Sequence, residues 1–268
     1  MRWWARACVG LIVIYGVMLG VIYVRQEHLM LNFAPVADNH AYAFDTTVED
    51  IWLERDGARL HGVLFRTDAA VPARGLVLYY KGNAGNVGNS SKMARTFLGL
   101  GFDVMSMDYR GFGKSRGPLS EDALLADAEA WYDLARERYG QQDIRVVGYS
   151  FGSTQASHVA ATRPVEDLIL FAPMKSILDL GRRRYPWVPT FISRFPLRSD
   201  LKLMQAHTAR IVIYHGTADA VVPFASGAEL KSVMGADDAF VEVAGAGHGD
   251  LPWTALVQED IALRWSGL

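Results

Sequence analysis

The sequence predicts an α/β fold, in which a mostly parallel, doubly wound sheet follows an antiparallel hairpin. From about residue 75 onwards, short continuous apolar runs alternate with stretches of helical spacing. This alternation is expected of parallel strands that are buried on both faces and joined by helices. Two β-like runs flank Arg55-Asp56-Gly57, which is a turn signal for a hairpin. An apolar run at the N-terminus and one long insertion complete the predicted architecture.

The strands and helices are predicted from the period of their apolar residues. The hairpin strands are Val48–Glu54 and Leu60–Arg66. The later strands are expected at Gly75–Tyr80, Phe102–Met107, Ile144–Val147, Leu168–Phe171, Arg210–Tyr214 and Phe240–Val243. Helices are expected at Ser90–Leu100, Glu121–Tyr139, Ser153–Thr162 and Trp253–Trp265.

The composition favours one large domain with an appendage. The chain has 268 residues, of which 50% are hydrophobic, and this is enough for a single large core. A net charge of -2 offers no basic surface for nucleic acid, which we exclude as a partner. The single cysteine, Cys8, excludes an intrachain disulfide and a cysteine-based metal site. We divide the chain into an anchor (1–25), a connector (26–45) and a main domain (46–268).

A charge-free run near the N-terminus predicts a membrane anchor. Ala7–Val24 contains roughly 18 residues and spans roughly 27 Å as a helix, near the lower limit for crossing a hydrocarbon core. Trp3, Trp4 and Tyr23 lie near its ends, where interfacial aromatic residues are favoured. A cleaved signal peptide is the competing interpretation, but the run ends in Tyr23-Val24-Arg25-Gln26 without a convincing small-x-small cleavage site. We therefore expect a single-pass anchor that is not cleaved.

The charges that flank this run predict its orientation. Arg2, Arg6 and the free amine lie on the N-terminal side, and Arg25 alone lies on the other. The excess of positive charge before the run places the N-terminus in the cytoplasm. The main domain is then expected on the non-cytoplasmic side of the membrane.

A strand, a tight turn and a helix meet at Gly148-Tyr149-Ser150-Phe151-Gly152. The Gly-x-Ser-x-Gly pattern is typical of a nucleophile elbow, in which glycines leave room for a turn too tight for Cβ atoms. Such a turn exposes the serine hydroxyl above the sheet. Glycine is common in this chain, so the pentapeptide alone also fits a chance match. The strand before it and the helix after it favour the elbow.

A serine nucleophile needs a base to take its proton and a carboxylate to orient that base. His248 lies in a glycine-rich loop just after the last predicted strand, and Asp219 follows the strand before it. The order Ser150, Asp219, His248 fits a nucleophilic triad built at three strand ends. Asp108 and Asp250 are weaker candidates for the carboxylate. Asp108 precedes the serine, and Asp250 is too close to the histidine along the chain to brace it easily.

Together these motifs resemble the α/β-hydrolase superfamily, in particular its membrane-anchored branch of BEM46-like and ABHD13/ABHD17-type serine hydrolases. The resemblance covers roughly residues 45–268, and its matching stretches are Lys81–Asn86, Asp108–Ser115, Gly148–Gly152, His215–Pro223 and Gly247-His248. It implies an α/β-hydrolase fold and an oxyanion hole made by the backbone N–H groups of Phe151 and Asn83. In the family the loop after the third strand usually reads His-Gly-Asn. Lys81 replaces that histidine here, which is expected to alter loop packing or to add a positive charge near the mouth of the site.

The insertion, at about residues 173–209, interrupts the alternation of strands and helices. Such an insertion is typical of a lid. Tyr185, Trp187 and Phe191 lie in it beside several arginines. One interpretation is an apolar lid for an acyl chain, with cationic residues facing a lipid head group or a membrane surface. The other is an ordinary cap packed on the core with a solvated basic face.

The chemistry implied is acyl transfer to water on an ester or thioester, through an acyl-enzyme on Ser150, with no cofactor and no metal. The expected substrate is an acyl ester or thioester, with lipids among the candidates, and the expected setting is a membrane bilayer. A serine peptidase on the same fold and a non-catalytic membrane scaffold are the alternatives. The insertion offers no clear acidic pair to hold a peptide N-terminus, and a scaffold has no need of the three groups. The oligomeric state is not predicted.

Overall fold

The computed structural model describes residues 3–55, 57–67, 72–140, 143–206 and 210–266. Asp56 of the hairpin turn, Arg2 of the charged flank and the end of the insertion at 207–209 lie outside these ranges. The strands are β1 (Val48–Arg55), β2 (Ala58–Phe65), β3 (Gly75–Tyr80), β4 (Asp103–Met107), β5 (Asp143–Tyr149), β6 (Asp167–Phe171), β7 (Arg210–Gly216) and β8 (Ala239–Val243).

These strands form one sheet with the order β1-β2-β4-β3-β5-β6-β7-β8. β2 runs antiparallel to β1 and to β4, and every later pair is parallel. The parallel strands therefore end at one edge of the sheet, which is where α/β proteins build their sites. The mostly parallel sheet with an antiparallel start is confirmed.

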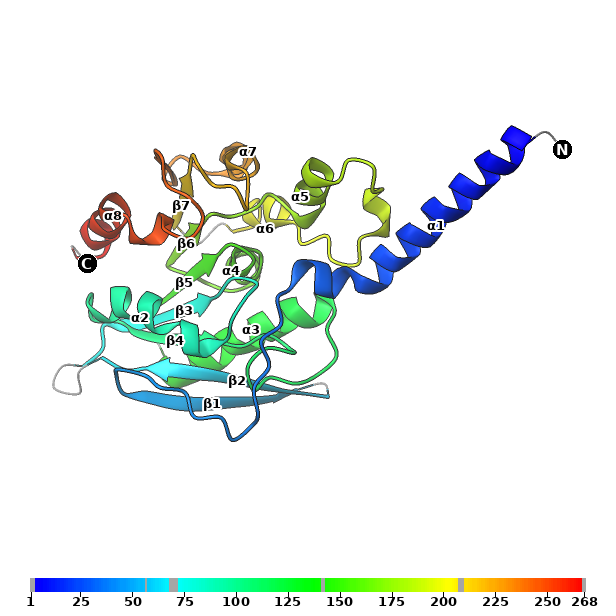
Figure 1. Ribbon diagram of the computed structural model, residues 1–268. Helices are drawn as coiled ribbons and strands as arrows, with labels where there is room; N and C mark the ends of the chain where they lie inside the picture. The colour runs from blue at the N-terminus through cyan, green and yellow to red at the C-terminus, as the bar shows by residue number, and fades with distance from the viewer. Residues whose placement is uncertain (1–2, 56, 68–71, 141–142, 207–209, 267–268) are drawn as a thin grey trace.

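Helices cover both faces of the sheet (Figure 1). They are α2 (Ser91–Leu98), α3 (Glu121–Tyr139), α4 (Gly152–Thr162), α5 (Ile177–Arg184), α6 (Ser199–Leu203), α7 (Phe224–Ala228) and α8 (Ala255–Ser266), after an N-terminal α1 (Trp3–Met30). Short 3-10 turns lie at Val87–Asn89, Thr190–Ile192, Glu229–Val233 and Leu251–Trp253. Six of the seven short turns and helices that the sequence did not predict lie in the loops after β3, β6 and β7, where apolar runs are too short to show a period.

Two apolar cores sandwich the sheet because successive strand residues point to opposite faces. On β3, Leu78 and Tyr80 belong to the core that contains residues of α3, α4 and α6. Val77 and Tyr79 belong to the other core, with residues of α2 and α8. All six residues of β3 are buried, so the continuous apolar run in the sequence has its expected cause.

α1 extends away from the rest of the chain and carries the predicted anchor (Figure 1). It is the one helix in the described ranges that is long and apolar enough to cross a membrane, and none of its most apolar window is buried. A core helix of a soluble protein is mostly buried, so this exposure argues against that role. The sequence placed the end of the anchor at residue 25, but the helix continues to Met30. Its last turns carry Gln26, which contacts the insertion.

Over its described residues, 173–206, the insertion is helical and irregular and contains no strand. It contains α5, the turn at Thr190–Ile192 and α6. Ser176 caps α5, because its hydroxyl accepts a hydrogen bond from the backbone N–H of Asp179. We call the described part of this segment, residues 173–206, the lid.

Candidate active site

Ser150 occupies a strained turn between β5 and α4. Its φ is +53°, a left-handed conformation that is uncommon for a residue with a Cβ. Gly148 and Gly152 have no room for a side chain: a Cβ on Gly152 would lie 2.1 Å from the carbonyl oxygen of Tyr80, and one on Gly148 would lie 2.7 Å from the Cα of Ser153. The glycines of the motif therefore let α4 pack directly against the end of β3.

The structure brings Ser150, His248 and Asp219 into one hydrogen-bonded line. His248 Nε2 lies 2.9 Å from Ser150 Oγ, and Nδ1 lies 2.7 Å from Asp219 Oδ2. The line runs across the carboxyl edge of the sheet, because Ser150 follows β5, Asp219 follows β7 and His248 follows β8. The geometry is that of a serine, a base and an orienting carboxylate. The catalytic roles of the three side chains stay predictions.

Asp219 is held ionised in this line. Its side chain is fully buried, and burial acts to raise the pKa of its carboxyl. The hydrogen bond and the attraction from His248 outweigh that effect, together with the backbone N–H groups of Val221 and Val222, and the net pKa lies below its usual value. Both N–H groups donate to Oδ1 at 2.8 Å, leaving Oδ2 for the histidine.

Two neighbouring rings help to define this arrangement. Tyr149 stacks on the ring of His248 with centroids 5.3 Å apart, and its hydroxyl donates a hydrogen bond to the carbonyl of His248 at 2.9 Å. His215 is buried and hydrogen-bonded to the carbonyl of Val222 through Nε2, and burial lowers the pKa of its imidazole. His215 is thus a neutral structural residue. From the sequence alone, no role was assigned to the side chain of Tyr149.

The two predicted oxyanion donors belong to the turn before α4 and to the loop after β3. Phe151 directly precedes α4, and the first N–H groups of a helix have no partner within it. Asn83 follows β3, and its side-chain amide is directed away from this site, donating to the carbonyl of Met30 at 2.7 Å. Any contribution of Asn83 to an oxyanion hole is therefore left to its backbone N–H. Its role, like that of Phe151, stays a prediction.

Lys81, which stands where the family usually has histidine, points into the protein. Its side chain is 5% exposed, donates to the carbonyl of Gly85 at 3.1 Å, and lies 3.6 Å from Asp108 Oδ1 and 4.2 Å from the centre of the Phe112 ring. Burial lowers the pKa of Lys81 to about 8 and raises that of Asp108 to about 6, and their mutual attraction opposes both shifts. The ammonium of Lys81 is therefore buried against Asp108 and Gly85, and Lys81 is also one of the residues that line a cavity beside Ser150 and His248. Both expected effects of the replacement stay predictions.

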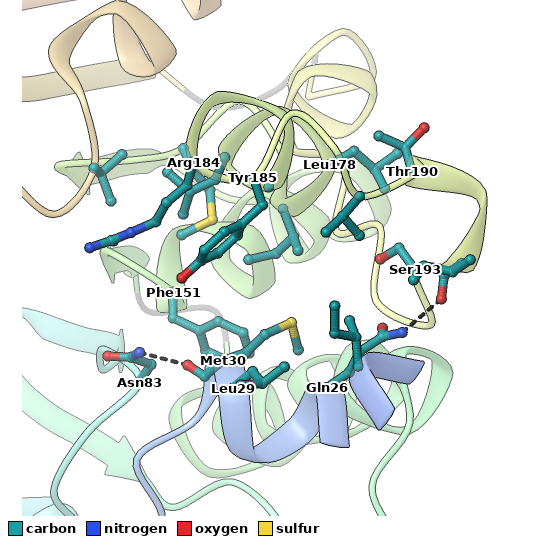
Figure 2. Close-up of a pocket in the computed structure, with 18 of the residues that line it drawn as sticks. Gln26, Leu29, Met30, Asn83, Phe151, Leu178, Arg184, Tyr185, Thr190 and Ser193 are labelled. Atoms are coloured by element: carbon teal, nitrogen blue, oxygen red, sulfur yellow. Dashed lines mark hydrogen bonds between the residues drawn. The ribbon is translucent and has the colours of Figure 1, made fainter. Parts of the chain in front are cut away.

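Two cavities meet at Ser150. The larger has a volume of ≈ 480 Å³ and is walled by apolar side chains of the lid, of the end of α1 and of the loop after β7 (Figure 2). The smaller, of ≈ 300 Å³, lies toward His248 and is lined by asparagines of the loop after β3 together with apolar side chains such as Met93, Pro252 and Trp253. A molecule bound across the serine would thus meet mainly apolar side chains on one side and a mixture of amide and apolar groups on the other.

Of the three lid residues named from the sequence, two line the larger cavity. Tyr185 and Trp187 form part of its wall, but Phe191 does not. Phe191 is 85% exposed on the lid. The wall formed by Ile22, Gln26, Leu29 and Met30 of α1 was missed, because the sequence assigned those residues to an anchor and a connector. Within the described ranges, no group of three or more His, Cys, Asp or Glu side chains is placed to hold a metal ion.

The buried Lys81–Asp108 pair predicts a pH-dependent stability effect. The folded pKa of Asp108 lies above its unfolded value, so the folded state binds more protons and stability falls as pH rises through this range. Lys81→Met removes the attraction that lowers the pKa of Asp108, so the unfolding free energy of this variant continues to fall to a higher pH. We expect a loss of about 3 kcal/mol of unfolding free energy at pH 7 and a smaller loss at pH 5, measured by urea unfolding.

The control is the double variant Lys81→Met/Asp108→Asn, which has no buried carboxylate. Its own unfolding free energy is therefore expected to lack the fall between pH 5 and pH 7 that Asp108 gives the parent protein. A single variant that loses as much stability at pH 5 as at pH 7 would contradict the assignment.

Comparisons with known proteins agree with this architecture. Residues 75–202 match the α/β hydrolase fold family. The α/β hydrolase domain-containing protein WAV2 of Arabidopsis thaliana is 32% identical over 241 residues, which cover 80% of this chain and 76% of that protein. Lysophosphatidylserine lipase ABHD12 of Macaca fascicularis is 28% identical over 207 residues, covering 70% of this chain and 52% of that protein.

Among solved structures, the esterase Pf2001 of Pyrococcus furiosus superposes with a TM-score of 0.69 and 17% identity, covering 88% of this chain and 100% of that chain. At this identity the likeness shows the fold alone. The sequence relatives show the family, and they include ABHD-type proteins such as the lipase above. The chain therefore belongs to the α/β-hydrolase superfamily, as its motifs predict.

Proposed function

We propose that this protein is a membrane-anchored serine hydrolase that cleaves carboxylic ester or thioester bonds through Ser150, His248 and Asp219. The observation that carries the proposal is the line of hydrogen bonds from Ser150 to Asp219 through His248, at 2.9 and 2.7 Å. Membership of a hydrolase family and the likeness to an esterase fold support it. The strained turn at Ser150 supports it as well.

In the proposed reaction, His248 removes the proton of Ser150 as Oγ attacks the acyl carbonyl carbon. Asp219 accepts a hydrogen bond from Nδ1 and stabilises the imidazolium that forms. The backbone N–H groups of Phe151 and Asn83 hold the negative oxygen of the tetrahedral intermediate, and one such donor is worth about 3 kcal/mol in the transition state. His248 then protonates the leaving alcohol or thiol, which leaves the acyl group on Ser150. In the second half of the reaction His248 takes a proton from water as the water attacks the acyl-enzyme, and it returns that proton to Ser150 as the carboxylic acid is released.

The two cavities favour an ester with unequal ends. The acyl chain fits the larger cavity, whose lining is mainly aliphatic and aromatic. The leaving group fits the smaller cavity, where asparagine amides offer hydrogen bonds to hydroxyl or phosphate oxygens. One relative is named as a lysophosphatidylserine lipase and one solved neighbour as a monoacylglycerol lipase. Both names fit an ester with one acyl chain and a polar head.

We also propose that α1 anchors the protein in a membrane with the hydrolase domain on the non-cytoplasmic side. α1 is exposed and apolar over most of its length. A signal sequence near an N-terminus has the same composition, but cleavage within or after this helix would remove residues that line the larger cavity. Retention of α1 is thus consistent with a complete site.

The first prediction concerns covalent labelling of the serine. A fluorophosphonate probe is expected to label Ser150, and Ser150→Ala abolishes the label because Oγ is the attacking atom. Asp219→Asn is expected to lower kcat by roughly 10⁴-fold, since the histidine loses its orienting carboxylate. Ser157→Ala is the matched control: Ser157 lies buried on α4 and donates a hydrogen bond within that helix, so its label is retained. Labelling that survives Ser150→Ala rejects the proposal.

The second prediction separates the two kinds of lid aromatic residue. Trp187→Ala removes part of the cavity wall, and we expect the preference for a dodecanoate over a butyrate p-nitrophenyl ester to fall by roughly fivefold or more, equivalent to about 1 kcal/mol of apolar contact. Phe191→Ala, its control on the same loop, leaves the ratio of the two kcat/KM values within about twofold, because Phe191 lies outside the cavity. Equal effects of the two variants would contradict an acyl-binding lid.

The third prediction concerns orientation. A C-terminal fusion to alkaline phosphatase, which is active only outside the cytoplasm, is expected to be active in cells, because the excess of positive charge before α1 retains the N-terminus inside. A C-terminal fusion to β-galactosidase is expected to be inactive. The reverse pattern would place the hydrolase domain in the cytoplasm.

A further inference from the structure

The end of α1 contacts the lid along one helical face. Within the last turns of α1, the side chains that are at least partly buried are Met18, Leu19, Ile22, Gln26, Glu27 and Met30. Their spacing of three or four residues places them on one side of the helix. Val21 and Val24, between them, are 57% and 67% exposed. We call this face the anchor seam.

Gln26 holds the lid to the anchor seam with both ends of its amide. Nε2 donates to the carbonyl of Ile192 at 2.7 Å, and Oε1 accepts from the backbone N–H of Arg194 at 2.7 Å. Glu27 adds an ion pair with the guanidinium of Arg194 at 3.0 Å. Gln26 is 7% exposed on a helix that is otherwise largely open. Burying a side-chain amide costs free energy unless it is hydrogen-bonded, and here the lid provides both hydrogen-bond partners.

A third hydrogen bond lies further along the apolar run. Tyr15 donates from its hydroxyl to the carbonyl of Trp187 at 2.7 Å. Tyr15 is ten residues before Arg25, which is about 15 Å along a helix, and it lies inside the charge-free run. A backbone carbonyl at that depth in a bilayer costs several kcal/mol unless it is hydrogen-bonded. The hydroxyl of Tyr15 therefore provides the carbonyl of Trp187 with a hydrogen-bond donor, which lipid tails lack.

Part of the anchor seam closes the larger cavity, together with Leu29, which lies beside the seam. Ile22, Leu29 and Met30 line the cavity on the α1 side, opposite the lid residues Leu178 and Tyr185 (Figure 2). The lid thus meets Ser150 at one end and the apolar stretch of α1 at the other. A chain bound in this cavity lies between the lid and the membrane-facing helix.

We propose that α1 is a wall of the acyl-binding cavity, that Gln26 is the positioning residue that holds the lid against it, and that the acyl chain of the substrate enters from the bilayer along α1. This inference rests on the proposed function for the identity of the ligand, a lipid with a single long acyl chain. The membrane anchor is then part of the binding site as well as a tether.

The test uses the full chain carrying Ser150→Ala, in phosphatidylcholine nanodiscs that contain a long-chain fatty acid with a diazirine. Light cross-links the probe to whatever lines its binding site, with no need for turnover. We expect cross-links on the tryptic peptide Ser176–Arg182, which carries the cavity-lining residues of α5. Fluorophosphonate labelling of the protein with Ser150 intact tests the hydrolase proposal separately, so the two can fail independently.

Two neighbouring anchor residues provide the matched comparison. Ile22→Trp adds bulk on the face that lines the cavity, and cross-linking of the α5 peptide is expected to fall by at least fivefold. Val21→Trp adds the same bulk on an exposed face and is expected to leave that cross-linking within twofold. Equal cross-linking in the two variants, or cross-links confined to α1, would overturn the proposal.

The positioning role of Gln26 is measured by limited proteolysis of the same protein. Gln26→Leu keeps the approximate volume of the side chain but removes both hydrogen bonds to the lid, and tryptic cleavage after Arg194 is expected to accelerate by at least fivefold. Val24→Ala, on the exposed face of the same turn, is expected to leave the rate unchanged. Equal cleavage rates in the two variants would show that Gln26 does not hold the lid.

Discussion

The close approach of α4 to the end of β3 is the constraint on which the candidate site depends. The backbone of Gly152 meets the carbonyl of Tyr80 where no Cβ fits, so the chain leaving β5 has to turn within a few residues. Ser150 takes the positive φ that this turn requires. The cost of that conformation, roughly 1–3 kcal/mol, is offset by the buried strands and helix on either side. The serine hydroxyl is therefore fixed above the sheet edge by packing, before any ligand binds.

The rest of the site follows from the parallel sheet. Because β5, β7 and β8 end at the same edge, the loops after them need only a few residues to bring a serine, a carboxylate and an imidazole together. Asp219 is fixed by two backbone N–H groups of its own loop. His248 is fixed by that carboxylate and by the ring of Tyr149. Asp219 is thus restrained within its own loop, and His248 is oriented by groups at the ends of β5 and β7, which limits the entropy lost when the line forms.

The sequence predicted those parts of the structure that local patterns determine. Buried strands show as continuous apolar runs, and glycines flank Ser150 because the turn excludes a Cβ, so the sheet and the nucleophile candidate were both visible. The direction in which a side chain points was not visible in the sequence. Lys81 was expected to change either the packing of its loop or the charge at the mouth, and the sequence could not show that its ammonium lies 3.6 Å from Asp108, which follows β4. Phe191 and Trp187 look alike in the sequence, and only the fold of the lid separates the lining residue from the exposed one.

The end of α1 shows most clearly why such contacts escape a sequence-based prediction. An apolar helix followed by Gln26 and Glu27 has the composition of an anchor that is joined to a polar connector. The sequence does not show which residues Gln26 and Glu27 contact. The partner lies more than 160 residues away, where the lid presents the carbonyl of Ile192 and the N–H of Arg194. The irregular part of the lid between its two helices leaves such backbone groups without a partner in secondary structure, and water can bind them only where the lid is solvated. Beside a bilayer fewer water molecules are available to bind these groups. The side-chain amide of Gln26 on α1 takes the place of water by binding both the carbonyl of Ile192 and the N–H of Arg194.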